Sequence, residues 1–470
     1  MQGAQALDAA TPKQPDLLNL LGAVFLARGD DAKARAQFEA ALAVDPGFQG
    51  ALDNLDRLDI RAGQGGKVEE RLRQRLAEAP QDEAAVLRLA GLLAGRNDTD
   101  AAVALLQDKA AALPDSVPVR LALAAIYRAR NDQAHLLAVA DELQALGAKG
   151  DAAGLEAAGN LYLAGGQAAR AVDAFRALRE RQPDNVGAQL LLARAQYVAG
   201  DKAGAEATLT QARQQAPDNL IVNNSLVDLR LQSGDIQGAL AFAAGVAGID
   251  PGQAAQLQAK VLLAAKRGPE AVTVLEKALA AGPSPNLARA LFSARIQTGQ
   301  ETAAVEGLHE WVASHPDDAA SLDLLSQAMI RKADFAAAAG VAEQAAQLVP
   351  TNPTILNNLA WLRQELGQPG AEDLARRAHQ LAPNSPEVTD TLGWILVRNG
   401  KVEEGLGLLR EADDGARNAN PDIRYHLAYA LQASGQKDAA RTIIEQLMAS
   451  DQPFAEREAT KQLWTTLKDS

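Results

Sequence analysis

Apolar residues recur along this chain in pairs of stripes, each with the spacing of an α-helix. The first stripe has members three and four positions apart, on one helical face: Leu18, Leu21 and Phe25. The second stripe repeats this spacing: Ala34, Phe38 and Ala41. Between such stripes stands a glycine followed by Asp or Gln, which suits a left-handed residue after the first helix: Gly29, Gly166, Gly200, Gly234, Gly299 and Gly435. The pattern predicts helix–turn–helix units, the first from Pro15 to about Phe48.

Prolines mark the period of these units. They lie 34 residues apart at Pro12, Pro46, Pro80 and Pro114, and again at Pro183, Pro217 and Pro251. The gap between the two series is 69 residues, so it contains one unit without a proline. Proline disfavours helix just before it, so each one ends a unit. Extending the period gives 13 units, which end at or near Pro46, Pro80, Pro114, Ala148, Pro183, Pro217, Pro251, Pro283, Pro316, Pro350, Pro383, Pro421 and Pro453.

A later unit matches the first one closely. Its corresponding residues are Leu155, Ala158, Gly159, Tyr162, Ala171, Phe175, Leu178 and Pro183. Small residues, such as Gly22 in the first unit, stand where the two helices approach each other. This pattern resembles the tetratricopeptide repeat family. The resemblance implies an all-α fold, a right-handed superhelical solenoid of about 13 helix–turn–helix units with a C-terminal capping helix and almost no strand.

The register divides the chain into three parts. Residues 1–14 are expected to be the tail of a preceding repeat, because Met1 falls inside a unit. A truncated N-terminus is the favoured interpretation, and a naturally short first helix is the alternative. Residues 15–453 form the tandem array, and residues 454–470 form the capping helix that covers its last open face.

The second unit is a weak match to the pattern. Asp56 and Asp59 occupy positions where the pattern has small and aromatic residues. Since this unit lacks packing residues, we expect faster amide exchange at Asn54–Gly66 than at Leu359–Leu366.

Composition narrows the choice of partners. The net charge of −13 argues against sequence-independent binding of nucleic acid or of an anionic membrane, which needs clustered Lys and Arg. The chain has no cysteine, which excludes disulfides, thiol catalysis and Cys-zinc sites. No apolar run reaches the roughly 18 residues of a membrane span, and no signal peptide is visible. The compartment stays open on these grounds.

The sequence shows no catalytic constellation. His309 and His315 superficially resemble a zinc-protease helix, but that chemistry needs two His four residues apart, and this spacing turns them about 240° from each other. Residues 63–67 are similar to a phosphate-binding loop, yet Arg61 replaces the required first Gly and Val68 replaces Ser or Thr. An inter-helix turn is the favoured interpretation. We therefore predict no catalysis, no cofactor and no metal site.

The resemblance also implies which residues face a ligand. In tetratricopeptide arrays the first helix of each unit lines the inner, concave surface, and positions 5 and 9 of the unit point into the groove. In the last three units these positions hold Asn357 and Trp361, Asp390 and Trp394, and Tyr425 and Tyr429. In the middle units they include Asn224, Asp228, Lys260, Arg289, Asp323 and Gln327. These twelve residues are the predicted binding surface.

The row of Trp361, Trp394 and Tyr429 suits two kinds of ligand. Rings stack on apolar side chains or on sugar faces, so the partner is a protein or peptide, or alternatively an exopolysaccharide. The competing interpretation is that the rings pack against neighbouring helices. If they bind a ligand, replacing Trp361 and Trp394 with Ala abolishes binding and leaves helicity unchanged.

The C-terminal part carries a second resemblance. Residues 357–362 (NNLAWL), 390–394 (DTLGW) and 423–428 (IRYHLA) resemble the PEP-CTERM/exosortase-associated tetratricopeptide protein PrsT. That resemblance implies a bacterial periplasm or cell envelope and a role in exopolysaccharide production or protein sorting. We expect a non-catalytic scaffold; direct polysaccharide binding and a regulatory arm of a longer enzyme are the alternatives, and a cytoplasmic location stays open.

Overall fold

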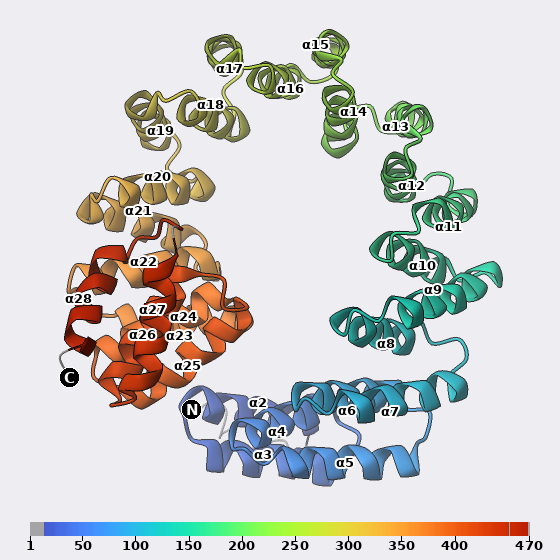
Figure 1. Ribbon diagram of the computed structural model, residues 1–470, viewed down its shortest axis with the longest axis vertical. Helices are drawn as coiled ribbons and strands as arrows, with labels where there is room; N and C mark the ends of the chain where they lie inside the picture. Colours follow the sequence, from blue (N-terminus) through green and yellow to red (C-terminus); the bar gives the residue numbers. More distant parts are fainter. Residues whose placement is uncertain (1–13, 451, 469–470) are drawn as a thin grey trace. The chain divides into compact units, whose positions relative to one another are not determined.

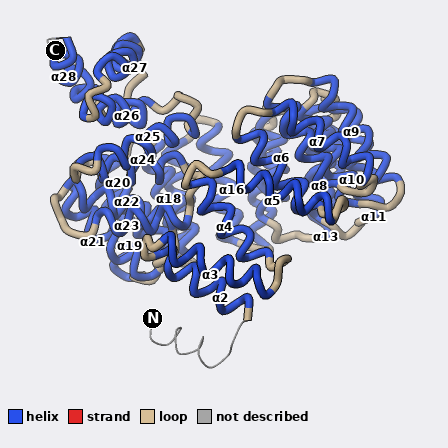
Figure 2. Tube along the Cα trace, turned by 90° about the horizontal axis from the view of Figure 1, so that it is seen from below, coloured by secondary structure: helices blue, strands red, loops and turns tan. Residues whose placement is uncertain are grey.

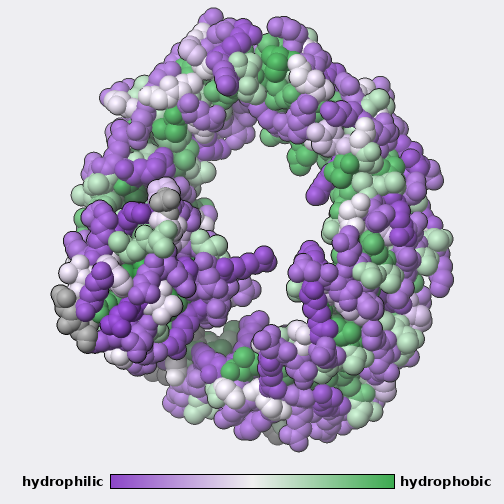
Figure 3. Space-filling model, viewed as in Figure 1, coloured by the Kyte–Doolittle hydropathy of each residue, from purple (hydrophilic) through white to green (hydrophobic). Residues whose placement is uncertain are grey.

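The computed structural model describes residues 14–450 and 452–468, and these residues form helices joined by short loops (Figure 2). There are 27 α-helices and one short 3-10 helix in these ranges and no strand, which confirms the all-α prediction. The predicted repeat tail falls almost wholly on residues 1–13, which lie outside the described residues. In the view of Figure 3, hydrophilic residues cover most of the visible surface and hydrophobic residues appear as scattered patches.

The chain divides into two units, one up to Leu226 and one from Val227. The helices follow one another in chain order (Figure 1). The first unit contains α2 (Pro15–Ala27), α3 (Asp31–Val44), α4 (Gln49–Arg61), α5 (Gly65–Glu78), α6 (Glu83–Gly95), α7 (Thr99–Ala112), α8 (Val117–Ala129), α9 (Gln133–Ala148), α10 (Ala152–Ala164), α11 (Ala168–Arg181), α12 (Val186–Val198) and α13 (Lys202–Gln215). The division falls within α14 (Leu220–Gln232).

The second unit continues the same order of helices. It contains α15 (Ile236–Gly245), the 3-10 helix η1 (Val246–Gly248), α16 (Pro251–Ala264), α17 (Gly268–Ala281), α18 (Pro285–Gln297), α19 (Glu301–Ser314), α20 (Ala319–Arg331), α21 (Phe335–Leu348), α22 (Pro353–Glu365), α23 (Ala371–Leu381), α24 (Pro386–Arg398), α25 (Val402–Gly415), α26 (Pro421–Ala433), α27 (Lys437–Ala449) and α28 (Arg457–Lys468). On α28, Leu463 and Leu467 are buried in a cluster with residues of α26 and α27.

The turn inside each helical hairpin contains a residue with positive φ. The six glycines expected at such turns all have φ between 71° and 87°. Among the described hairpins, the complete series is Gly29, Gly63, Asn97, Asn131, Gly166, Gly200, Gly234, Lys266, Gly299, Ala333, Gly367, Gly400 and Gly435. Glycine adopts this conformation without steric cost and Asn tolerates it, so eleven of these turns have a residue suited to the left-handed region.

Small residues allow close packing inside the hairpins, as the sequence predicts. A Cβ atom on Gly22 would lie 2.3 Å from the Phe38 ring, and one on Gly159 would lie 2.4 Å from the Phe175 ring. Both rings are fully buried. Glycine at these positions of the first helix is therefore a packing requirement.

The first helices of successive hairpins lie on the inner side of the curve within each unit. Contacts join α2 with α4, α6 with α8, α8 with α10, α16 with α18, α22 with α24 and α24 with α26. Comparable contacts between successive second helices are absent from the described parts of the chain. Elements that approach more closely lie on the concave side, which agrees with the expected role of the first helices.

Candidate functional site

Two of the predicted ligand-binding rings are buried in the second unit. Trp394 on α24 is 5% exposed, and its ring stacks on that of His426 on α26 at a centroid distance of 4.2 Å. Tyr429 meets the Trp394 ring edge-on at 5.1 Å. Tyr425 is also 5% exposed, and its burial raises its pKa to about 12. Trp394 and Tyr425 therefore pack between hairpins in this structure, and a ligand has no access to their faces.

Asp390 contacts His426, a residue outside the predicted binding surface. Its two carboxylate oxygens both lie 2.9 Å from Nδ1 of His426, and both side chains are buried. Burial alone would lower the pKa of His426, but the charge and hydrogen bond of Asp390 outweigh it and raise that pKa above its ordinary value. Asp390 and His426 thus form a buried hydrogen-bonded pair that joins α24 to α26.

The same kind of link recurs between other hairpins. Positions are counted within each helical hairpin, with Pro15 as position 1 of the first one. A side chain at position 6 of one hairpin contacts the side chain at position 5 of the hairpin before it. We call these contacts inter-hairpin links. They join Asn54 Nδ2 to Asn19 Oδ1 at 3.0 Å, Arg88 to Asp53, Asn358 Nδ2 to Asp323 Oδ1 at 3.2 Å, and His426 to Asp390. The sequence signal is a pair of polar residues 35 or 36 positions apart.

A polar cleft of about 510 Å³ opens between α20, α22 and α24. Ile330 and Val388 are two of its eight lining residues, and the other six have amide, hydroxyl or carboxylate side chains: Gln327, Thr354, Asn357, Asn358, Ser385 and Glu387. Oδ1 of Asn357 is buried and accepts no hydrogen bond. Gln327 donates to Asp323 at 2.8 Å, and burial raises the pKa of the Asp323 carboxyl. The structure thus brings three predicted residues, Gln327, Asn357 and Asp323, to one place.

Trp361 lies one helical turn beyond Asn357 on α22. Its ring is half-buried and meets the Phe335 ring edge-on at 5.3 Å. It therefore keeps part of its surface open to solvent, unlike Trp394.

The remaining predicted residues lie apart from this cleft. Lys260 pairs with Asp228 at 2.7 Å, and Asn224 donates to the backbone carbonyl of Leu220 at 2.9 Å. Arg289 pairs with Asp318 at 2.9 Å. The two predicted cations are thus already engaged with carboxylates. A binding role for these residues stays a prediction.

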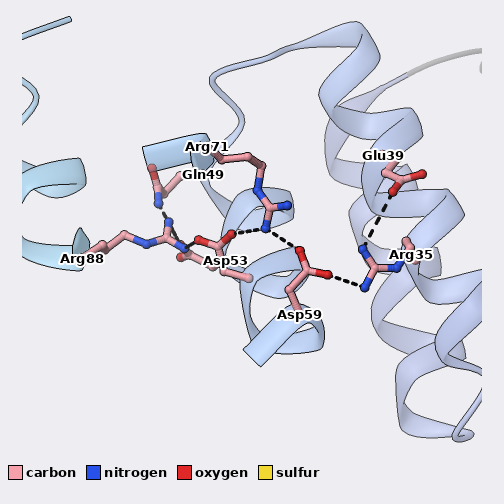
Figure 4. A network of polar contacts seen from close by, with 8 residues as sticks. Arg35, Glu39, Gln49, Asp53, Asp59, Arg71 and Arg88 are labelled. Carbon is pink, nitrogen blue, oxygen red and sulfur yellow. Dashed lines mark hydrogen bonds and ion pairs between the residues drawn. The ribbon is translucent and has the colours of Figure 1, made fainter. Parts of the chain in front are cut away.

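The two aspartates of the weak second hairpin form a charged network with arginines (Figure 4). Asp59 is fully buried and accepts hydrogen bonds from Arg35 on α3 and, at 2.6 Å, from Arg71 on α5. Asp56 is bound by Arg71 and by Arg88 on α6. Burial alone would raise the pKa of Asp59, but the two arginines outweigh it and hold that pKa below its ordinary value. These charge pairs therefore lie beside buried apolar residues of the same hairpin, such as Leu55 and Leu72.

Nothing in the described residues points to a metal or a membrane segment. No group of three or more His, Asp or Glu side chains is placed to hold a metal within residues 14–450 and 452–468. His309 is exposed, while His315 stacks on Trp311 at 3.7 Å. Across the described helices, none combines the length and apolarity needed to span a membrane.

Antiparallel helical hairpins stacked at a period near 34 residues, each turning through a left-handed residue, define an α-solenoid. Tetratricopeptide repeat models match the chain at four segments: one matches residues 162–222 and 396–461, and another matches residues 2–47 and 199–254. These four segments are therefore similar to tetratricopeptide repeats. No curated protein matches it significantly in sequence.

Several solved structures are similar to this chain at low identity. The crystal structure of the APC/C hetero-tetramer Cut9–Hcn1 has 14% identity and a TM-score of 0.41, covering 97% of this chain and 96% of that one. Yeast Tom70 has 15% identity and a TM-score of 0.41, with 93% and 99% covered. Naa15/Naa10 bound to HypK-THB has 16% identity and a TM-score of 0.40, with 100% and 75% covered. These similarities carry no conclusion about the partner of this chain.

Proposed function

We propose that this chain is a non-catalytic protein-binding scaffold that holds an extended peptide segment in the polar cleft between α20, α22 and α24. The observation that carries the proposal is the lining of the cleft, which brings together the amides of Gln327, Asn357 and Asn358. An amide side chain both donates and accepts hydrogen bonds. An extended peptide offers donors and acceptors at regular intervals along its backbone.

The dimensions and neighbours of the cleft suit this ligand. Its volume of about 510 Å³ falls in the range of ligand-binding sites. The half-buried ring of Trp361 lies one turn further along α22 and offers an apolar surface to a side chain of the peptide. The tetratricopeptide repeats support a protein partner, because solenoids of this kind present extended concave binding surfaces.

The proposed setting is a bacterial cell-envelope system for exopolysaccharide production or protein sorting. Its support is the resemblance of residues 357–362 and 390–394 to PrsT. A second candidate function is direct binding of an exported polysaccharide, because the amide and hydroxyl groups of the cleft can also bind sugar hydroxyls. A third candidate function is that of a regulatory arm of a longer enzyme. The complete gene sequence tests this candidate.

The test uses Asn357→Leu, which removes one of these amides, and Trp361→Ala. Trp394 stays intact because it is buried. The control is Asn160→Leu, an exposed asparagine on the first helix α10 of the other unit. Each protein captures partners from a bacterial envelope extract, and a synthetic peptide from any captured protein is then titrated. We expect at least a tenfold loss of peptide affinity in both cleft variants and none in the control. Loss of a glycan instead supports the second candidate, and identical eluates contradict both.

A further inference from the structure

A second cleft opens in the first unit between α4, α5 and α6. Its volume is about 730 Å³. Its apolar lining residues are Ile60 from α4, Val68 and Leu72 from α5, and Leu92 from α6. The charged residues Arg88, Arg96 and Asp56 and five glycines make up the rest of the lining. We call this the α4–α6 cleft; it shares no residue with the polar cleft of the proposed function.

Two successive first helices, α4 and α6, make few contacts at this cleft. Contacts join α2 with α4 and α6 with α8, but no comparable contact joins α4 with α6 within the described residues. The buried apolar residues also change cluster here, since one cluster ends at Leu58 and the next begins at Val68. The joint is bridged instead by the ion pairs of Arg88 with Asp53 and Asp56.

Glycines leave the α6 wall of the cleft bare. Gly91 and Gly95 lie four positions apart on α6, both exposed, and a Cβ on either would meet no atom within 4 Å. Packing therefore does not require them, in contrast to Gly22, which lies against a ring. Glycine inside a helix costs about 1 kcal/mol relative to alanine, and Gly91 is four residues from the end of α6. Gly91 therefore leaves open space on this face of α6.

The charge around this cleft differs from that of the whole molecule. Residues 49–96 carry eight Lys and Arg and eight Asp and Glu, whereas the complete chain has a net charge of −13. Arg96 pairs with Glu69 at 3.0 Å, and its side chain is 38% exposed. An anionic group is therefore repelled less here than over most of the chain. The guanidinium of Arg96, which has five N–H donors, lies in the lining of the cleft.

We propose that the α4–α6 cleft binds a peptide segment in which bulky apolar side chains are followed by a carboxylate. The apolar side chains lie against Ile60, Leu72 and Leu92. The peptide backbone crosses α6 at Gly91, and the carboxylate pairs with Arg96. The site shares no residue with the polar cleft, so it adds a second binding site to the scaffold.

The test uses a fluorescent acetyl-Ala-Phe-Leu-Glu-Ala-amide peptide, with a Glu-to-Gln version and a Phe-Leu-to-Ala-Ala version as probes. Binding to the full chain is followed by anisotropy at low salt. We expect saturable binding that weakens about fivefold for the Gln peptide and is lost for the Ala-Ala peptide, since one ion pair near the surface is worth less than two buried apolar side chains.

Gly91→Leu fills the cleft and strengthens α6, so it should reduce binding at least tenfold while leaving the fold intact. Its control is Gly340→Leu, another exposed helical glycine with open space around it, on α21. Arg96→Gln should remove the preference for Glu over Gln and leave the Gln peptide unaffected. The proposal is overturned if the Phe-Leu peptides do not bind saturably, or if Gly91→Leu binds them as well as wild type does.

Discussion

The α4–α5 hairpin and the α24–α26 region are joined to their neighbouring hairpins by different interactions. Both regions contain a buried aspartate. At α4–α5, Asp56 and Asp59 are bound by arginines from α3, α5 and α6, and an open cleft adjoins them. At α24–α26, the ring of Trp394 covers a single Asp390–His426 pair, and the apolar cluster continues through α28.

The difference shows that one repeat pattern tolerates two kinds of joint. Apolar packing is distributed over many contacts. A network of charges fixes a few atoms firmly and leaves space beside them. Such networks depend on every member, because removing one partner strands a buried charge.

Replacing Trp394 with Ala should have the largest effect. Deleting a buried Trp costs about 3–5 kcal/mol through lost contacts and a residual cavity. Urea denaturation with hydrogen exchange should show the loss in α24–α28. Trp361→Ala is the control, since its ring is half-buried and should cost less than half as much. Equal effects of the two substitutions would contradict the burial described here.

Asp59→Ala should have the next largest effect. It leaves Arg35 and Arg71 facing a buried void, at a cost of about 3 kcal/mol, the low end for broken buried pairs because both arginines remain partly exposed. The matched control is Asp31→Ala, which breaks an exposed pair with Arg61 and should cost less than about 0.5 kcal/mol. Exchange at α4 and α5 reports the change, and a cost as small as the control's would refute the network's role.

The two regions should respond to pH in opposite directions. His426 has a raised pKa, so its contribution is complete below about pH 6.5 and is lost as the pH rises through the folded value. Glu456 and Asp413, whose pKa values burial raises, act in the same direction at lower pH. Asp59 has a lowered pKa, so its contribution is present above about pH 3.9 and is lost as the pH falls further.

Urea unfolding of α24–α28, followed by Trp fluorescence at pH 6 and pH 9, measures the first of these effects. We expect lower stability at pH 9, and His426→Gln should remove most of the difference. An unchanged pH dependence in that variant would assign the effect to other groups.

Amide exchange should show the smallest difference. We expect Asn54–Gly66 to exchange about tenfold faster than Leu359–Leu366, equivalent to about 1.4 kcal/mol in local opening. The reason is that an apolar cluster ends at Leu58, whereas Leu359 and Leu362 are buried among apolar residues of α21 and α22. Equal rates would mean that the charged network stabilises α4 as well as apolar packing does.

The fold was largely predictable because its signals are local. The left-handed glycines and the contact of Gly22 with Phe38 each follow from residues within one helical hairpin. The period follows from comparing neighbouring hairpins. The candidate site was less predictable. Position 9 places Trp394 on the predicted inner face of its helix. The ring of His426, from the next hairpin, stacks on Trp394 and covers that face. The sequence pattern of one hairpin also does not reveal the partner of Asp390, because His426 lies 36 residues away in the next hairpin.

The inter-hairpin links have a consequence for recombination of repeats. An array of near-identical hairpins invites duplication, deletion and shuffling of its parts. Here neighbouring hairpins fit in pairs: Asp53 requires the cation of Arg88, whereas Asn19 is matched to the amide of Asn54. Transplanting the hairpin of Arg88 behind that of Asn19 would replace an amide pair with an unmatched charge. At these joints, grafted arrays should retain hairpins together with their native neighbours.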